Sequence, residues 1–378
     1  MSIIKSDFIR MWLRAKALMI ISRYLIKEVF HTLLAVTFVL LLVFISQQLV
    51  RYLSYAASGK IAANILLQIV GFEIPYLLAL LLPLGLFLGI ILTYGRLYTD
   101  NELRVLHACG LSIKRLIMIT GTLAALIALV VGILMLWVNP TIAENKQKIL
   151  TSGSADNLLD TLMPGRFQVT SDGKRVAYVE KISRNRKEAD NIFIAEQEKN
   201  AVDMTGTPWI VLSAKNGYQM IDSQTQEAFV VATNGYRYAG TPGQNDYRII
   251  QFEKYAIKTP DTNLNTQRQI DEAIPTKKLI KTYHDPNSAS ELQWRFAIPF
   301  SAFLLALMAI PLSQVKPRQG RYTMLLPAVL IYVAYMNLLF AGRNLIEQKT
   351  VSVLMGLWWV HLIALVLIIG LLWRTRRS

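Results

Sequence analysis

The chain has 378 residues, of which 53% are hydrophobic and 17% are charged, with a mean hydropathy of +0.36. Soluble domains carry about 25% charged residues, so this composition excludes an ordinary soluble protein. The formal net charge is +15, but the basic residues lie at the ends of apolar runs, which indicates topology signals rather than nucleic-acid binding. The single cysteine, Cys109, excludes a scaffold held by intrachain disulfides.

The chain begins with a basic, mildly amphipathic segment, residues 1–18, for which two interpretations stay open. The segment can lie in the membrane interface, or it can be an extension upstream of the usual first residue, Met19. No cleavable signal peptide is expected, because the first apolar run is too long and no small-residue cleavage site follows it.

Six apolar runs have the length that crosses a bilayer, about 20 residues. The stretch 61–95 would reach roughly 50 Å as one helix. We therefore expect Pro75 to break it into a short surface helix, residues 62–72, and a span. The six predicted spans are residues 29–50, 75–94, 116–138, 294–312, 324–341 and 353–373.

A short helix is predicted in GRLYTDNELRVLHACGLS, residues 95–112, between the second and third spans. Thr99 and Glu102 fit a capping box. Gly110 fits the residue just after a helix end, and Ser112 can cap the next helix. Two interpretations of Glu102 stay open. Its role can be limited to capping the helix, or the helix can be a rigid lever on which Glu102 pairs with an arginine of a separate ATPase.

Residues 139–287, between the third and fourth spans, are predicted to form an all-β domain. Runs such as RVAYVEKI and WIVLSAKNGYQMI are rich in β-branched and aromatic residues with partial alternation. Three segments are typical of hairpin turns: Ser171-Asp172-Gly173, Asn216-Gly217 and Asn234-Gly235. Short strands at this spacing indicate a sandwich, a jelly roll or an open barrel, followed by a polar linker, residues 260–275.

Basic residues flank the spans unevenly, which predicts the orientation in the membrane. One side collects Arg10, Arg14, Lys16, Arg23, Lys27, Arg96, Arg104, Lys114, Arg115, Lys316, Arg318, Arg321, Arg374, Arg376 and Arg377. The other short loops hold only Arg51, Lys60, Arg343 and Lys349. We therefore expect both termini and residues 95–112 in the cytoplasm, with the β domain outside.

Nothing in the sequence supports catalysis. No G-x-x-x-x-G-K-[ST] phosphate loop occurs, and we find no nucleophile–base set and no metal-ligand cluster. The four histidines, His31, His107, His284 and His361, are far apart in sequence, and we interpret them as structural or interfacial. No cofactor is expected, and uphill transport would have to draw its energy from a partner.

Three stretches resemble the LptF/LptG permeases of the lipopolysaccharide exporter: LYTDNELRVLHACGLS, ELQWRFAIPFSAFLLALMAIPLSQVKPRQGR and ISRYLIKEVF. The resemblance covers essentially residues 19–373, and the form HACGLS is more similar to the LptF branch. It implies a bacterial inner-membrane permease subunit that extracts lipopolysaccharide, paired with an LptG-type second permease on an LptB-type ATPase dimer. It also implies an LptC-type bitopic protein and a β-jelly-roll path to an LptA-type periplasmic bridge.

In that family the acid matching Glu102 lies in a coupling helix that docks into the ATPase. The resemblance therefore implies an ATPase-coupling role for Glu102 and for its neighbours Asp100, Arg104 and His107. The domain plan is an N-terminal extension, residues 1–18, three spans with the coupling helix 99–110 in residues 19–138, the periplasmic jelly-roll-like domain 139–287, and three spans in residues 288–378.

The phosphates of the implied cargo require cations at the outer mouth of the membrane part. Arg51 ends the first span there, Arg295 begins the fourth, and Lys60 is a further candidate. Gln48 stands where some family members have a lysine, which gives Arg51 a larger share of the predicted phosphate contact. Alternatively, Arg51 and Arg295 only extend to the membrane interface.

Two other membrane machines are alternatives: a lipoprotein-releasing permease, and a sensor with a β ligand-binding domain. The first usually has four spans, against the six counted here. The second would need a cytoplasmic output domain, for which the loops are too short. Co-purification of a soluble ATPase and a second six-span protein would discriminate between these classes and an LptF/LptG-type exporter.

Overall fold

A computed structural model of the chain describes residues 2–57, 61, 63–155, 164–169, 175–183, 188–197, 209–221, 228–241, 243–258, 267–314 and 323–377. Lys60, the Ser171-Asp172-Gly173 segment and the side chains of residues 1–18 lie outside this description. The chain forms two compact units. The helical unit contains Met1–Ser46, Phe72–Glu144 and Gln267–Ser378, and the sheet unit contains Gln47–Gly71 and Asn145–Thr266.

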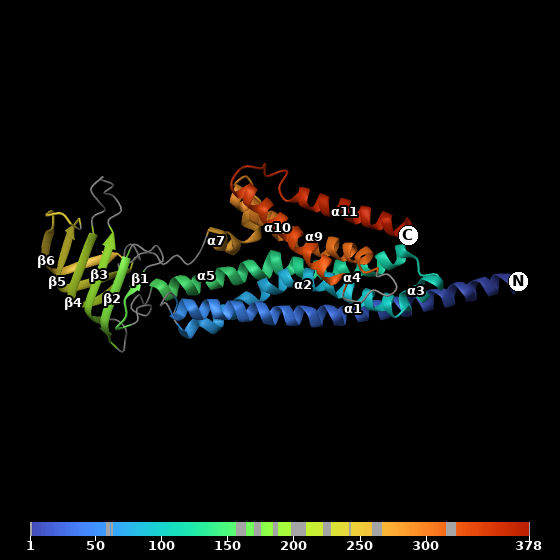
Figure 1. Cartoon of the computed structure of the whole chain (residues 1–378), viewed down its shortest axis with the longest axis horizontal. Helices are drawn as coiled ribbons and strands as arrows, with labels where there is room; N and C mark the ends of the chain where they lie inside the picture. Colours follow the sequence, from blue (N-terminus) through green and yellow to red (C-terminus); the bar gives the residue numbers. More distant parts are fainter. Residues whose placement is uncertain are drawn as a thin grey trace. The chain divides into compact units, whose positions relative to one another are not determined.

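Long apolar helices make up most of the helical unit (Figure 1). They are α1 (Ser2–Ala57), α2 (Leu66–Thr99), α4 (Ile113–Ile133), α9 (Pro286–Leu312), α10 (Leu325–Glu347) and α11 (Trp358–Arg377). Among the described residues, five helices are long and apolar enough to cross a membrane, and the apolar part of α11, Trp358–Arg374, is shorter. Five of the six predicted spans therefore have the expected helix.

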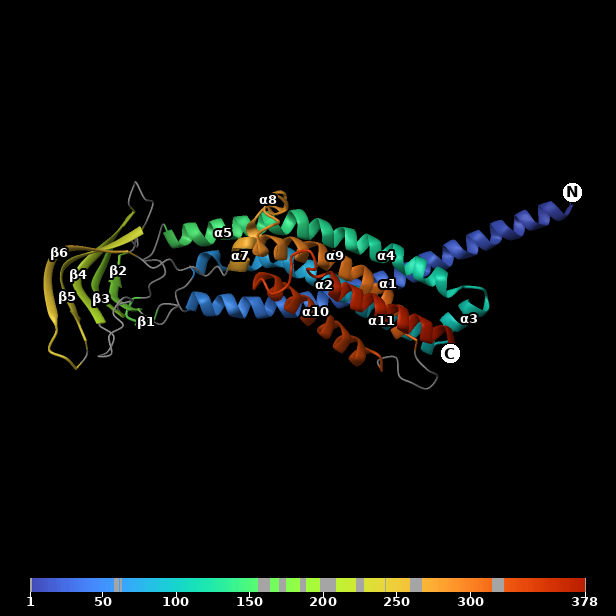
Figure 2. The same cartoon turned by 90° about the horizontal axis from the view of Figure 1, so that it is seen from above.

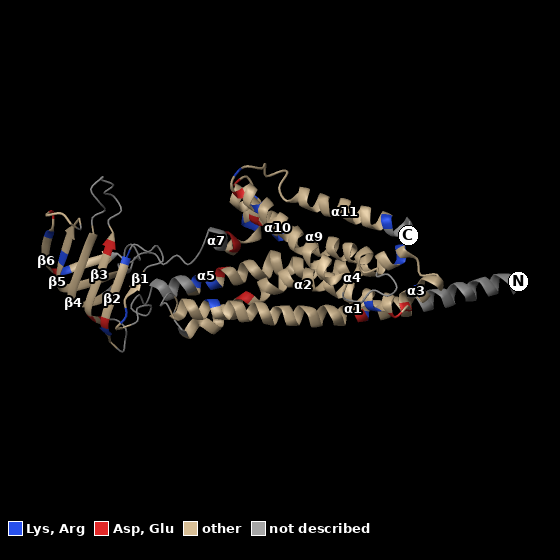
Figure 3. Ribbon diagram, in the orientation of Figure 1, with Lys and Arg blue, Asp and Glu red and all other residues tan. Residues whose placement is uncertain are grey.

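The core of the helical unit lies around α9, which packs against α4, α10 and α11. Most of α9 is buried, including Trp294, Ile298 and Leu305. Charged residues lie mainly toward the ends of the apolar helices and are sparse in between (Figure 3). This distribution is the one expected of helices that cross a bilayer, where an unpaired charge is costly.

The predicted helix break at Pro75 is wrong, because α2 continues through both Pro75 and Pro83. Proline is tolerated in apolar helices of this kind, where neighbouring helices and local adjustments satisfy the freed backbone groups. The expected surface helix at residues 62–72 is a short 3-10 turn, η1 (Ala63–Ile65), followed by the first turns of α2. A Gly85-x-x-x-Gly89 pair on α2 brings its backbone close to α1.

Helical structure also extends beyond the predicted spans, both before and after the strands in the sequence. α4 passes through a π-helix, η2 (Leu134–Val138), into α5 (Asn139–Ala155). After the strands come α7 (Gln267–Ala273), inside the predicted linker 260–275, and α8 (Thr276–Lys281), which follows it. Among the described residues, the strands run from Gln168 to Lys258, within the predicted β region, residues 139–287.

The sheet unit holds one six-stranded antiparallel sheet whose strands bend along their length (Figure 2). The strands are β1 (Gln168–Val169), β2 (Arg175–Ile182), β3 (Glu188–Gln197), β4 (Trp209–Ile221), β5 (Ala228–Gly240) and β6 (Arg248–Lys258). Each described strand pairs with the next along the chain. This is a meander, whereas a jelly roll has Greek-key connections, so the β prediction is confirmed but the jelly-roll order is not.

An exposed polar band crosses the sheet where the strands bend. It consists of two consecutive residues from each of five strands, all exposed except the half-buried Thr233: Glu180-Lys181, Asp190-Asn191, Lys215-Asn216, Thr233-Asn234 and Glu253-Lys254. Asn191 and Asn234 have positive φ, which asparagine tolerates better than most residues. Asn216-Gly217 and Asn234-Gly235 therefore lie at this bend, inside strands, and the predicted hairpin turns there are wrong.

At the polar band, the alternation of inward-facing and outward-facing side chains along each strand is interrupted. A regular strand buries every second residue, but β3 buries Ala189 and Ile192, three positions apart, and these pack together with Val179. A Cβ added at Gly217 would lie 2.4 Å from Ile192 Cδ1, so the two sides of the bend face each other. The inner face is apolar, with one cluster around Ile192 and another around Leu212, Ala214 and Ala232.

Candidate coupling site and outer-mouth residues

The short helix predicted between the second and third spans is α3 (Glu102–Ala108). Its start differs from the predicted capping box, because α2 runs to Thr99 and the Thr99 hydroxyl donates back to the Gly95 carbonyl. The turn into α3 is made by Asn101, with a φ of 61°, whose side-chain oxygen accepts a hydrogen bond from Arg104 at 2.8 Å. Arg104 thus closes the turn that begins the helix.

The end of α3 is the predicted one. Gly110 has a φ of 100°, the Leu111 N–H donates to the Leu106 carbonyl, and the Gly110 N–H donates to the His107 carbonyl. These two hydrogen bonds form a Schellman motif. The Ser112 side chain then accepts from the Arg115 N–H and caps α4. The chain is therefore held tightly on both sides of a single sharp turn.

Side-chain contacts from α1 hold the turn between α2 and α3 in place. The Tyr24 hydroxyl donates to Glu102 Oε2 at 2.9 Å, and Arg96 of α2 pairs with Glu28 of α1 at 2.5 Å. On α3 itself, Leu103 is fully buried in the core of the helical unit. A displacement of α3 would therefore be transmitted to α1 and α2 through side-chain contacts.

Several side chains in and next to α3 are exposed, among them Glu102, although it accepts a hydrogen bond from Tyr24. Asp100, Glu102, Val105 and Cys109 are exposed, and the Val105 side chain is 58% exposed. An exposed acid beside an exposed aliphatic side chain is suited to a protein contact that combines a charge-assisted hydrogen bond with apolar packing.

His107 faces inward. Its Nδ1 lies 2.5 Å from the Leu111 carbonyl oxygen, so this nitrogen must carry the proton, and its Nε2 lies 3.5 Å from the Tyr98 hydroxyl. The four predicted coupling residues thus divide into two exposed acids, Asp100 and Glu102, and two structural side chains, Arg104 and His107. Sequence analysis missed Tyr24, Glu28 and Arg96, because their pairing is tertiary and no local pattern signals it.

In the sheet unit, Arg51 and Lys146 both lie near the buried ring of Tyr52. Their charged groups are 5.2 Å and 5.8 Å from the ring centroid, within cation–π range. Gln48, one turn before Tyr52 on α1, is half-buried. Lys146 was missed, because the predicted span ended at Val138 and the basic run on α5 was assigned to the β domain.

Arg295, the remaining cargo-contact candidate, is 1% exposed and belongs to a buried ion network. It donates to Glu291 Oε1 at 2.8 Å, and Glu291 Oε2 accepts from Arg343 at 2.8 Å. Arg343 also pairs with Glu347 at 3.0 Å and lies over the Trp294 ring. The Arg295 guanidinium is therefore engaged by protein groups and does not face an open surface.

The same arginine supports the π-helix η2. Pro140 has no N–H to donate to the carbonyl of Leu136. The Thr276 hydroxyl donates to that carbonyl at 2.6 Å and accepts from Arg295 at 2.8 Å. Arg295 also donates to the Asp271 and Glu272 carbonyls at the end of α7. One side chain thus ties α7 and α8 to α9 and to η2.

Within the described part of the chain, no group of three or more His, Cys, Asp or Glu side chains is placed to hold a metal ion. Two features remain as candidate functional sites: the exposed acids Asp100 and Glu102 at α3, and the cations Arg51 and Lys146 near Tyr52.

Comparison with known proteins assigns the family. The family described as "Lipopolysaccharide export system permease LptF/LptG" matches residues 23–374. The chain is 32% identical to the lipopolysaccharide export system permease protein LptF of Escherichia coli K12 over 358 residues, which cover 94% of this chain and 96% of that protein. The LptF of Shigella flexneri matches at the same identity and coverage. The chain therefore belongs to the LptF/LptG family of lipopolysaccharide export permeases.

Proposed function

We propose that this chain is one of the two permease subunits of an inner-membrane ABC exporter, and that the exporter extracts lipopolysaccharide and passes it toward the outer membrane. In this proposal the chain crosses the membrane six times, with α11 as the sixth span and both termini in the cytoplasm. Its partners are an LptG-type permease, an LptB-type ATPase dimer, an LptC-type bitopic protein and an LptA-type periplasmic bridge. ATP hydrolysis takes place in the separate ATPase.

The observation that carries the proposal is the construction of α3. An ATPase can move membrane helices only through an element that is exposed to the ATPase and firmly joined to those helices. α3 meets both conditions, since Glu102 and Val105 are exposed while Leu103 is buried and Tyr24 and Arg96 connect the turn to α1. Asp100 adds a second exposed acid for an arginine or lysine of the ATPase.

The cargo explains why an external motor is needed. Each buried methylene contributes about 0.8 kcal/mol, so a lipid with several acyl chains resists extraction by tens of kcal/mol. The apolar inner face of the bent sheet offers the chains a path outside the membrane, in the manner of the family's jelly-roll-like module. Arg51, Lys60 and Lys146 supply positive charge for the phosphates, with Gln48 beside them.

Charge reversal at α3 tests the proposal in the assembled exporter. Glu102→Lys should lose most co-purifying ATPase, or leave ATP hydrolysis uncoupled from lipopolysaccharide release in proteoliposomes. Tyr24→Phe is the matched control for the internal hydrogen bond, because it keeps the Glu102 charge and should keep ATPase binding. Wild-type assembly and coupled release by Glu102→Lys would remove α3 from the mechanism.

Two further measurements address the cargo site and the orientation. Arg51→Glu should reduce photo-crosslinking of lipopolysaccharide without displacing the ATPase, and Lys146→Glu should do the same. Cys109 should react with a membrane-impermeant thiol reagent only after the inner membrane is opened. Labelling of Cys109 in cells with an intact inner membrane would place α3 on the wrong side and contradict the proposal.

A further inference from the structure

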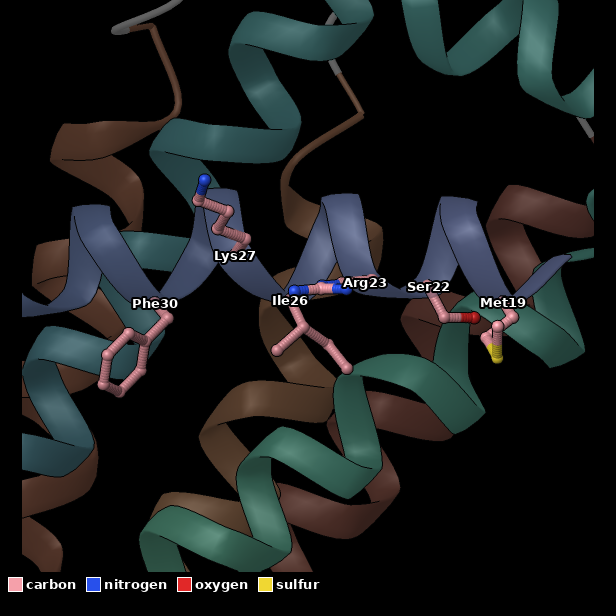
Figure 4. A pocket seen from close by; sticks show the side chains of 6 residues that line it. All are labelled: Met19, Ser22, Arg23, Ile26, Lys27 and Phe30. Carbon is pink, nitrogen blue, oxygen red and sulfur yellow. The ribbon is translucent and has the colours of Figure 1, made fainter. Parts of the chain in front are cut away.

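A shallow, open groove of about 510 Å³ lies along one face of α1 within residues 19–30, the segment that also carries Tyr24, whose hydroxyl donates to Glu102 of α3. Its lining residues recur at helical spacing and are Met19, Ser22, Arg23, Ile26, Lys27 and Phe30. Figure 4 shows the Ile26 and Phe30 side chains pointing to the same side of α1, with the Lys27 amine extending from the other side. All six lining residues belong to α1, so the groove is an open face of one helix, with apolar side chains along one edge and the cations Arg23 and Lys27 one turn apart.

On this part of α1, among the described residues, the charged side chains of one helix face are paired and those of the other are not. On the face turned to α2 and α3, Glu28 pairs with Arg96 and Tyr24 donates to Glu102. On the groove face, the side chains of Arg23 and Lys27 are exposed and have no ion pair within the described part of the chain. Two neighbouring cations beside apolar side chains suit an anionic ligand that also has an apolar part.

We propose that this groove binds an anionic phospholipid of the cytoplasmic leaflet, with the phosphate on Arg23 and Lys27 and an acyl chain along Ile26 and Phe30. The proposal rests on the orientation given under the proposed function. Arginine can hold a phosphate with two parallel hydrogen bonds, and the flexible lysine stem lets its ammonium follow the same phosphate. Basic pockets beside membrane helices on the cytoplasmic side suit such head groups.

The site differs from the cargo site in both leaflet and residues. The proposed lipopolysaccharide path starts near Arg51 and Tyr52 in the sheet unit, whereas the groove lies on α1 beside the α3 turn, in the helical unit. A lipid bound there would pack against the helix whose Tyr24 holds Glu102. The groove thus offers the membrane a way to influence how firmly the coupling helix is held.

The test uses the complete exporter in nanodiscs of phosphatidylethanolamine alone or with phosphatidylglycerol at three to one, followed by native mass spectrometry of retained lipid. The double variant Arg23→Gln/Lys27→Gln should retain phosphatidylglycerol roughly 30-fold less well, which corresponds to about 2 kcal/mol at 1.4 kcal/mol per tenfold. The matched control, Lys114→Gln/Arg115→Gln, neutralises two exposed cations outside the groove and should retain the lipid like the wild type.

Equal retention by the groove variant and the wild type would overturn the inference. Two other outcomes would also overturn it: protection of the groove by inorganic phosphate alone, and crosslinking of a photoreactive residue at Ile26 to a partner protein in place of lipid. ATPase co-purification is recorded in parallel with each preparation. A groove variant that keeps ATPase and lipid alike removes only this inference, whereas a Glu102→Lys variant with normal coupling removes the proposed function.

Discussion

The buried charges around Glu291 in the helical unit neutralise one another, whereas the sheet unit carries a band of mostly exposed polar side chains across its bend. In the helical unit, Arg295, Glu291 and Arg343 are each at most 3% exposed and form continuous ion pairs. In the sheet unit, the Glu180-Lys181 to Glu253-Lys254 band stays in solvent at the bend. In addition to its apolar core, the helical unit therefore depends on the pairing of a few buried charges, and the sheet depends on its backbone ladder and on close packing across the bend.

This difference predicts where each unit is fragile. A buried charge that loses its partner is costly, because the remaining charge has no water to solvate it. A bent sheet instead fails where an added atom would meet the backbone of the next strand. Hydrogen–deuterium exchange followed by mass spectrometry can report each unit separately, since peptides from α9 and from β4 and β5 are distinct.

The largest effect is expected from Glu291→Gln, which leaves both Arg295 and Arg343 without their shared carboxylate. Removing one member of a buried pair costs about 3–5 kcal/mol. We expect a strong loss of thermal stability of the purified complex, with faster exchange in α9 and α10 and unchanged exchange in the strands.

Glu347→Gln is the control for the buried network. Glu347 also pairs with Arg343, but its side chain is 21% exposed, so water can replace part of the lost contact. Its effect should be clearly smaller than that of Glu291→Gln. Equal effects would show that burial does not determine the cost, and the contrast between the units would lose its physical basis.

The sheet should respond most to Gly235→Ala. A Cβ at this position would lie 2.3 Å from the Ser213 carbonyl oxygen, and backbone cannot move aside as a flexible side chain can. Overpacking of this kind costs about 1–3 kcal/mol. Exchange should increase in β4 and β5 and stay unchanged in α9. Gly71→Ala, whose Cβ would meet nothing within 4 Å, should leave both units as they are.

Sequence patterns predicted the membrane helices well, because bilayer thickness directly determines the length of an apolar run. They failed where a distant residue decides the local structure. The π-helix η2 depends on Thr276, which is 140 positions away from Leu136. α2 continues through Pro75, as proline can in an apolar helix packed among neighbours, whereas a proline read in isolation predicts a break.

The sheet was predicted as β structure, but its bend was not. Asparagine followed by glycine has a strong intrinsic preference for hairpin turns, and this local preference was followed. The pairs of polar residues indicate a bend only when five strands are aligned, which requires the register. At the coupling site, Gly110 could be predicted from its turn chemistry, whereas the Tyr24–Glu102 contact joins residues 78 positions apart.

A moderate effect is expected from Thr276→Val, which removes the hydroxyl that serves the Leu136 carbonyl and Arg295. A buried acceptor left without a donor costs about 1–3 kcal/mol. We expect faster exchange in η2 and α5 and a lower thermal midpoint than for Thr276→Ser, which keeps the hydroxyl. If the valine and serine variants behave alike, the hydroxyl does not support the π-helix.

The smallest effect concerns the loop between β5 and β6 and depends on pH. The Thr241 N–H and hydroxyl donate to Asp246 at 3.0 Å each, which holds the pKa of Asp246 below its ordinary value of 3.8. A carboxylate whose pKa falls on folding stabilises the folded state above its unfolded pKa, and this contribution is lost as pH falls through the folded value. Exchange in residues 241–248 should therefore rise below about pH 3.8 in the wild type. In Asp246→Asn, exchange in this loop should not depend on pH after correction for the intrinsic rate. The control Glu253→Gln, which removes an exposed acid of the polar band, should keep the wild-type profile. A wild-type profile in Asp246→Asn would assign the pH response to another group.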